Sequence, residues 1–116
     1  MNTPASVAAG TAAAAGSFEL APAPDGGLAA QGPLTFATAR RARLLGLRSI
    51  AAGDGQALEI DCGAVTASDS AGLALLLDWL AVAHRAGRKL RYRRLPQDLA
   101  ALARISEVEE LLERGV

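Results

Sequence analysis

The sequence predicts an α/β domain in which helices cover a mixed β-sheet of about four strands. Short stretches with apolar residues at every second position alternate with longer stretches whose apolar residues recur every three or four positions. Clusters of glycine and proline separate these stretches. We expect the element order β-β-α-β-α-β-α-α, because strands that alternate with helices of this length form a sheet covered by helices.

Length and composition exclude several classes of protein. The chain of 116 residues suits one domain, and its 12 Lys and Arg balance 12 Asp and Glu, unlike the basic excess of nucleic-acid binders. One cysteine allows no intramolecular disulfide, and one histidine leaves little material for a metal centre or a catalytic triad. No apolar run approaches the roughly 18–20 residues of a membrane span. We therefore expect a cytoplasmic protein that binds rather than catalyses, without metal or cofactor.

The first residues differ from the rest of the chain. Residues 1–16 are rich in alanine and carry no charged side chain, so we expect a disordered tail followed by one domain over residues 17–116. A secretory signal would need a basic region and a longer leucine-rich stretch. A short alanine helix is the alternative, although Gly10 and Gly16 weaken it.

The first half of the domain reads as a hairpin, a helix and a strand. Residues 17–21 and 28–31 are the expected hairpin strands, joined by a turn rich in proline and glycine and ended by Gly32-Pro33. Thr35 is a plausible N-cap for a helix over residues 36–50. Its expected apolar face is Phe36, Ala39, Leu44, Leu47 and Ile50. Residues 57–62 form the third strand, with Leu58, Ile60 and Cys62 inward, and residues 63–68 the loop after it.

The second half begins with a strong helix over residues 71–86, which Ser68 or Asp69 can cap. Its apolar stripe is Leu73, Leu76, Leu77, Leu80 and His84. Gly87 suits the left-handed position after a helix. A fourth strand over residues 89–95 follows, with Leu90 and Tyr92 inward. Pro96 then opens a third helix, whose apolar face is Leu99, Leu102, Ala103 and Ile105, and residues 107–114 form a short last helix.

The loop Ser68-Asp69-Ser70-Ala71-Gly72-Leu73 is the main candidate for function. A helix N-terminus presents unpaired N–H groups and a partial positive charge. The Ser70 hydroxyl can stay exposed there, while the small Ala71 and Gly72 leave room for another surface to approach. A phosphate on Ser70 would be stabilised by the dipole, would add about −1.5 to −2 charges, and would be opposed by Asp69. The plainer interpretation is that Ser and Asp are only helix caps.

Asp69-Ser70-Ala71-Gly72-Leu73, between the third strand and a leucine-rich helix, resembles the signature loop of STAS domains. These include bacterial anti-sigma-factor antagonists and the MlaB subunit of the Mla phospholipid-transport ABC system. The resemblance covers residues 17–116 and implies the STAS fold. In the antagonists a partner kinase phosphorylates the hydroxyl residue after the aspartate, which is Ser70 here. In MlaB-like proteins the same loop lies against the ATPase subunit.

A second stretch separates these two groups. Antagonists commonly carry a Gly-Glu-Leu-Asp motif after the second strand, whereas this chain has Gly32-Pro33-Leu34-Thr35. The stretch from Leu34 to Ala39 and the run from Gly72 to Leu77 are similar to the matching stretches of MlaB-like members. The resemblance therefore implies a non-catalytic subunit that docks on an ABC transporter ATPase and helps maintain outer-membrane lipid asymmetry. It would meet the membrane only through that complex. The alternative is an antagonist switched by its anti-sigma-factor kinase through Ser70.

The resemblance also suggests roles for single residues. Asp69 would cap and orient the helix, Ser70 would offer a small polar contact, and Leu73 would hold the helix to the sheet. Thr35 would shape the adjacent surface, and the partner-binding loop would also include Ser68, Ala71 and Gly72.

The remaining polar and aromatic candidates have plainer interpretations. We expect a half-buried His84 at a helix end, a Cys62 that fills the core, and solvent-facing Glu59 and Asp61. Trp79 is either a flank of the core or an exposed anchor. The basic cluster is expected on a solvated outer strand: Arg88, Lys89, Arg91, Arg93 and Arg94. No Walker-type loop occurs, so any ATP hydrolysis belongs to a partner.

Overall fold

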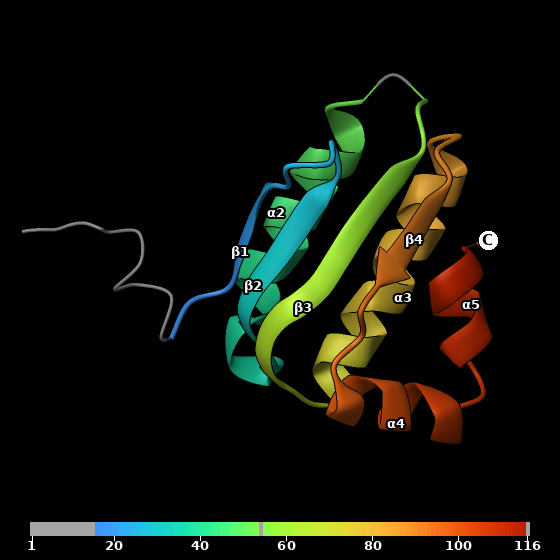
Figure 1. Cartoon of the computed structure of the whole chain (residues 1–116). Coiled ribbons are helices and arrows are strands. Elements are labelled where there is room, and N and C mark those ends of the chain that lie inside the picture. The colour runs from blue at the N-terminus through green and yellow to red at the C-terminus, as the bar shows by residue number, and fades with distance from the viewer. Residues whose placement is uncertain (1–15, 54, 116) are drawn as a thin grey trace, which may run out of the picture.

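The computed structural model describes residues 16–53 and 55–115, so nearly all of the predicted tail lies outside the described residues. The elements, in order, are β1 (Glu19–Pro22), β2 (Leu28–Leu34), the 3-10 helix η1 (Phe36–Thr38), α2 (Ala39–Ala51), β3 (Leu58–Ser68), α3 (Ser70–Arg85), β4 (Leu90–Arg93), α4 (Gln97–Ile105) and α5 (Glu109–Arg114). The predicted α/β class and the order of strands and helices are confirmed (Figure 1).

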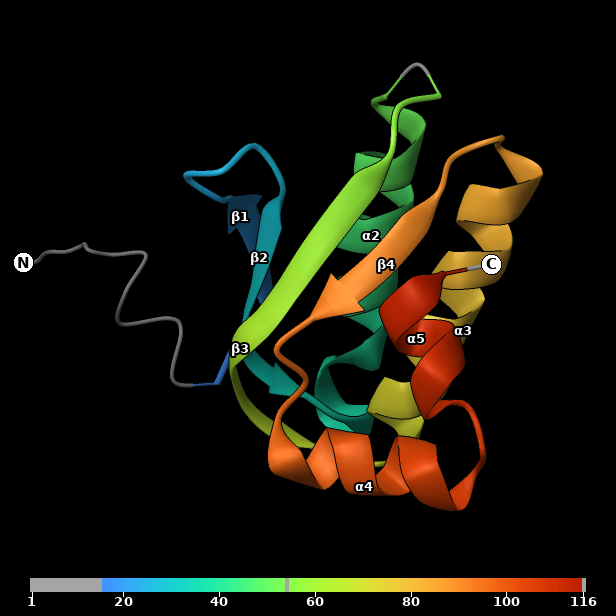
Figure 2. The ribbon, with the colours of Figure 1, turned by 45° about the vertical axis from the view of Figure 1, so that its right-hand side comes forward.

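The four strands form one mixed sheet in the order β1-β2-β3-β4. β1 pairs antiparallel with β2, while β2 with β3 and β3 with β4 are parallel pairs. The two parallel pairs need crossover connections, and α2 and α3 supply them. Both helices lie behind the sheet, α4 lies below it and α5 lies beside β4 (Figures 1 and 2). Within the described residues, no helix covers the opposite face of the sheet.

The core lies between this sheet and the pair α2 and α3. Alternating side chains of the central strands enter it, as their period of two predicts: Ile60, Cys62, Leu90 and Tyr92 are at most 2% exposed. The Tyr92 hydroxyl donates a hydrogen bond of 2.7 Å to the Leu76 carbonyl, so this buried polar atom is paired.

Both parallel strands of the centre are longer than predicted. β2 continues to Leu34 and β3 to Ser68, and these two end residues pair with each other. Gly32-Pro33 therefore does not end β2. Pro33 is tolerated because β1 pairs only as far as Gln31, so no neighbouring strand on that side requires an N–H from Pro33.

The predicted apolar face of α2 is confirmed for Ile50 and is wrong for Phe36 and Leu44. The buried row is Ala42, Gly46 and Ile50, while Phe36 is 82% and Leu44 is 50% exposed. The reason is close packing against α3. A side-chain carbon at Gly46 would overlap the indole ring of Trp79, so only glycine lets the two helices approach here. Trp79 is therefore a core residue, and its ring lies 6.2 Å from that of Phe18.

Two further differences concern single residues on the predicted apolar faces. His84 is exposed, and so is Ile105, with 80% of its surface accessible. Each lies in the last turn of its helix, α3 or α4, in which the buried positions are Ala83 and Ala103 instead. Gly87, by contrast, has the predicted left-handed φ of +77° after α3.

Arg88 is not part of a solvated basic strand, because it is only 8% exposed. Its Nη1 donates to the carbonyls of Ser49 and Ile50 at 3.1 and 3.0 Å, and its Nε donates to that of Gln56 at 2.7 Å. The last carbonyls of a helix have no intrahelical partner. Arg88 therefore fastens the C-terminal end of α2.

The outer edge of β1 is partly closed. Arg41 of α2 donates from Nε to the Phe18 carbonyl at 3.0 Å and pairs with the Glu19 carboxylate at 2.7 Å. At the other end of this four-residue strand, Pro22 offers no N–H.

Candidate functional site

Asp69 joins the two loops that meet at the N-terminal end of α3. Its Oδ1 accepts the N–H of Gly72 at 3.1 Å, which makes it the N-cap that the sequence predicted. Its Oδ2 accepts the N–H of Phe36 at 3.0 Å, from the loop after β2. One carboxylate thus fixes the start of α3 and holds the stretch that leads into α2 beside it.

This arrangement leaves Ser70 exposed as the first residue of α3. Leu73, one turn later, is 6% exposed and packs into the core, in line with its expected role of holding the helix to the sheet. The hydroxyl of Ser68 is buried and has no hydrogen-bond partner among the described residues. The hydroxyl of Ser70 is therefore the one this loop offers to another molecule.

Ala71 and Gly72 were expected to leave room for a second surface outside the domain. Ala71 is partly exposed, but Gly72 is buried and faces inward. A side-chain carbon at Gly72 would overlap the carbonyl of Leu34 at the end of β2. Gly72 thus allows α3 to approach the sheet, and its small size serves the fold rather than a partner.

Thr35 does begin the helical stretch, but by a different contact from that expected. Its own side chain makes no capping hydrogen bond. Instead its N–H donates to the Thr38 hydroxyl at 3.0 Å, and that hydroxyl donates to the Pro33 carbonyl at 2.8 Å. Thr38 is 8% exposed, so it is the residue that secures this loop.

Phe36 is a candidate that the sequence pattern placed in the core. Its backbone is held by Asp69, while its side chain is 82% exposed. A large exposed aromatic ring is typical of a contact surface, because aromatic residues are enriched among those that dominate the binding energy of interfaces. The site is thus composed of Ser70 and Phe36, on two loops joined by Asp69.

The carboxyl of Asp69 should make stability depend on pH. The N–H groups of Phe36 and then Gly72 hold the pKa of Asp69 below its ordinary value. Its contribution is therefore complete above about pH 4 and is lost as the pH falls through the lower, folded-state pKa.

We expect Asp69→Ala to lower the free energy of unfolding by about 2 kcal/mol at about pH 7, because it removes a cap and a second hydrogen bond to a carboxylate. Denaturant titrations at several pH values measure this. The difference in the free energy of unfolding between wild type and Asp69→Asn should shrink as the pH falls below about 4. A gap that does not change with pH would show that the charge on Asp69 does not matter.

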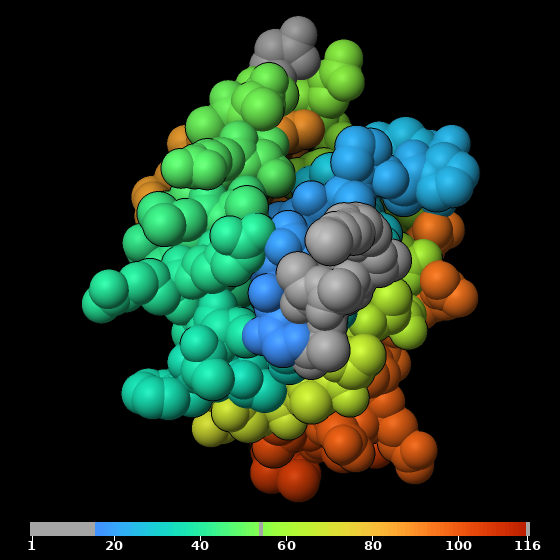
Figure 3. Space-filling model, turned by 90° about the vertical axis from the view of Figure 1, so that its left-hand side faces the viewer, coloured from blue at the N-terminus to red at the C-terminus, as the bar shows by residue number. Residues whose placement is uncertain are grey.

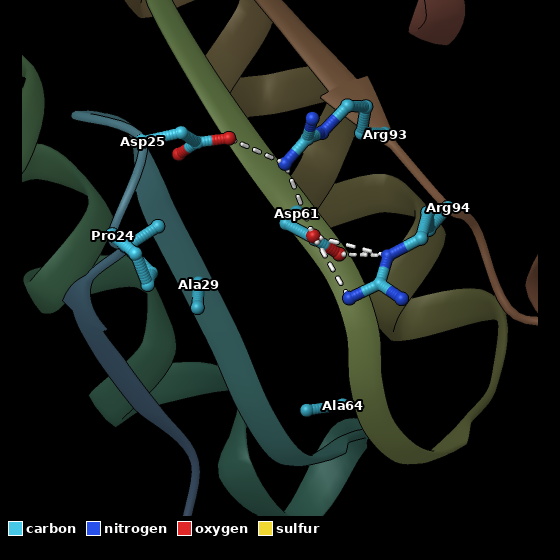
Figure 4. Close-up of a pocket in the computed structure, with 8 residues that line it drawn as sticks. Pro24, Asp25, Ala29, Asp61, Ala64, Arg93 and Arg94 are labelled. Carbon is cyan, nitrogen blue, oxygen red and sulfur yellow. Dashed lines mark hydrogen bonds and ion pairs between the residues drawn. The ribbon is translucent and has the colours of Figure 1, made fainter.

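The uncovered face of the sheet carries an ion-pair cluster around a hollow of about 250 Å³ (Figure 4). Arg93 pairs with Asp25 at 2.8 Å and with Asp61 at 3.3 Å, and Arg94 holds Asp61 at 3.0 Å. The contact with Arg94 lowers the pKa of Asp61. Since each arginine already faces a carboxylate, the hollow has no excess charge with which to hold an ion.

The other candidates have structural roles. Cys62 is fully buried, and burial raises the pKa of its thiol to about 12, so it is no nucleophile. Glu59 and Asp61 do not face solvent freely as expected: their side chains are 28% and 12% exposed, because Arg91 pairs with Glu59 at 3.0 Å and Arg94 covers Asp61. Among residues 16–53 and 55–115, no three His, Cys, Asp or Glu side chains lie close enough together to hold a metal ion. In the same part of the chain, no helix is long and apolar enough to cross a membrane.

Fold and loop together define a small α/β domain with an exposed hydroxyl at the start of its main helix. The family model described as "Mlab, STAS domain" matches residues 20–113, so the chain belongs to this family of STAS domains. No curated protein matches the sequence.

A solved structure supports the fold. The chain is similar to the murine Solute Carrier 26 family member A9 (Slc26a9) anion transporter in the inward-facing state, with a TM-score of 0.62 and 16% sequence identity. The match covers 83% of this chain but 14% of that transporter chain. It therefore shows a shared domain fold.

Proposed function

We propose that this domain is a non-catalytic subunit that docks on the ATPase of a phospholipid-transport ABC complex. The observation that carries the proposal is the pairing of an exposed Ser70 with an exposed Phe36 on loops that Asp69 fixes together. An exposed hydroxyl and a large exposed aromatic ring on loops that are held together suit a protein contact. Membership of the Mlab-type STAS family supports this kind of partner.

The residues around this surface fit docking better than catalysis. Ser70 has no histidine or carboxylate hydrogen bonded to its hydroxyl among the described residues, so nothing there activates it as a nucleophile. The Asp69 carboxylate is occupied by two backbone N–H groups. In the proposed complex, ATP hydrolysis belongs to the partner, and this domain sits cytoplasmically against it.

Ser70→Glu is expected to weaken binding to the ATPase about tenfold or more, because it adds a charge to a contact that becomes desolvated. The tagged full chain is purified under native conditions, the co-purifying ATPase is identified, and its affinity is titrated. Gln97→Glu is the matched control, since Gln97 is the first residue of α4 as Ser70 is of α3. Ser70→Thr keeps the hydroxyl and should bind like wild type.

Two results would contradict the proposal. One is that native purification yields no ABC ATPase. The other is that Ser70→Glu and Gln97→Glu bind the ATPase equally well, which would place the contact elsewhere.

A second candidate function is an anti-sigma-factor antagonist, and the exposure of Ser70 at a helix N-terminus favours it. A kinase can reach this hydroxyl, and the helix dipole would stabilise the phosphate formed there. Intact-protein mass spectrometry of the chain from its native cells separates the two functions. A phosphorylated fraction that disappears in Ser70→Ala supports the antagonist; unmodified protein bound to an ATPase supports the transport subunit.

A further inference from the structure

The outer face of α2 carries a ridge in which apolar and basic side chains alternate. Phe36, Arg40, Leu44 and Arg48 are spaced by four residues, so they lie one above another along the side of η1 and α2. All four are exposed, and the ridge lies opposite the buried row of α2. Two large apolar side chains in water, separated by cations, are not explained by the packing of this domain.

A hollow of about 280 Å³ follows this ridge. Its lining consists of three arginines and two leucines: Arg40, Arg41, Leu44, Leu45 and Arg48. Figure 3 shows this face, where α2 lies beside β1 and projects side chains into solvent. The hollow thus combines apolar and basic lining residues.

The charge of α2 is one-sided. The helix contains four arginines and no acidic residue. Two of the arginines are paired with carboxylates elsewhere in the fold: Arg41 with Glu19 at 2.7 Å and Arg43 with Asp78 at 3.2 Å. For Arg40 and Arg48, the described residues offer no ion pair, so the ridge carries two positive charges that remain unmatched.

The position of Arg40 strengthens this point. It lies in the first turn of α2, where the helix dipole disfavours a positive charge and favours a negative one. The first turn contains no acidic residue. Arg40 therefore gains nothing from its own helix, and its charge is better explained by a molecule that binds from outside.

We infer that the hollow on α2 binds an acidic segment of a partner protein, with carboxylates against Arg40 and Arg48 and an apolar side chain against Leu44. This inference rests on the proposed function, because it takes the docked protein as the partner. It adds that the partner's contacting surface is acidic. Charge complementarity selects an acidic segment. The hollow of about 280 Å³ accommodates a projecting side chain, whereas a flat anionic bilayer would meet only two unmatched cations.

The first test needs no native partner. The full chain, labelled with ¹⁵N, is titrated with a synthetic helical peptide that has glutamate and leucine on one face, and with the same peptide carrying lysine for glutamate. The acidic peptide should shift the amide signals of residues 36–48, and the basic peptide should not. Shifts elsewhere, or none, would overturn the inference. If the chain binds phosphatidylglycerol vesicles and not the acidic peptide, the inference fails and the hollow is a membrane contact instead.

The second test uses variants. Arg40→Glu with Arg48→Glu should lower affinity for the acidic peptide, and for the co-purifying ATPase, about tenfold or more. Arg85→Glu, an exposed arginine near the end of α3, is the control and should leave both unchanged. If the double variant binds the ATPase like wild type, this inference fails while the proposed function stands. If no ATPase co-purifies, the proposed function fails, and the peptide titration still decides this inference.

Discussion

Trp79→Ala is expected to lower the free energy of unfolding by about 3–5 kcal/mol, because it truncates the largest fully buried side chain of the described residues. The indole of this α3 residue lies against Gly46 of α2 and packs near the ring of Phe18. Removing it leaves a cavity that the rigid helix pair cannot close. Denaturant unfolding followed by circular dichroism measures the loss. A change below about 1 kcal/mol would mean that Trp79 does not hold the two helices together.

The same contact gives a sharper test through Gly46. In the wild type, Gly46→Ala should destabilise by about 1–3 kcal/mol, because the new methyl group meets the indole. In Trp79→Ala the same substitution should stabilise, by up to about 1 kcal/mol, since alanine favours helix and fills part of the cavity. The sign reversal in this double-mutant cycle identifies direct contact. Equal effects in both backgrounds would rule it out.

The second large effect is expected for Arg88→Met, which should lower the free energy of unfolding by about 3 kcal/mol. Methionine keeps most of the apolar stem but removes every donor. The carbonyls of Ser49, Ile50 and Gln56 would then lose the charged partner that they share. Gly53 leaves the space that this interaction needs, because a side-chain carbon at Gly53 would overlap the Arg88 guanidinium.

Lys89→Met provides the control for this prediction. Lys89 is the neighbouring cation and is exposed, so its replacement should change stability by at most about 0.5 kcal/mol. Arg88→Lys should recover only part of the loss, because one ammonium cannot reproduce the planar donors of arginine. If Arg88→Met and Lys89→Met are equally stable, the fastening of α2 by Arg88 is not significant.

The sequence predicted the strands of the centre well because their burial follows a period of two that the sheet imposes. Leu58, Ile60 and Cys62 point inward as their alternation indicates. The ends of these strands could not be predicted from local pattern. Leu34 pairs with Ser68, more than thirty residues away, and only that pairing extends both strands.

The sequence pattern mispredicted part of the buried face of α2, because large apolar residues do not occupy the closest helix contact. Ala42 and Gly46 form the buried row since close helix packing requires small side chains, and Leu44 then faces outward while Leu45 packs at the margin of the core. The spacing of Phe36, Arg40, Leu44 and Arg48 indicates an exposed row, because it places apolar and charged residues in one line. A true core face would not include two arginines in its line.

For the site, the sequence identified Asp69 as a cap but not as a bridge. Its second hydrogen bond joins residues 33 positions apart, and no local pattern contains that information. Arg88 shows the same limit. Lys89, its neighbour in sequence, is an exposed cation, but the contacts of Arg88 are carbonyls at the far end of another helix.

The partly closed edge of β1 has a consequence for behaviour at high concentration. An open strand edge invites another chain to extend the sheet, which is a common route to aggregation. Here Arg41 occupies the Phe18 carbonyl and Pro22 lacks a donor, so little of the edge remains for another chain. Within the described residues, a second copy of this domain therefore finds little free strand to pair with along β1.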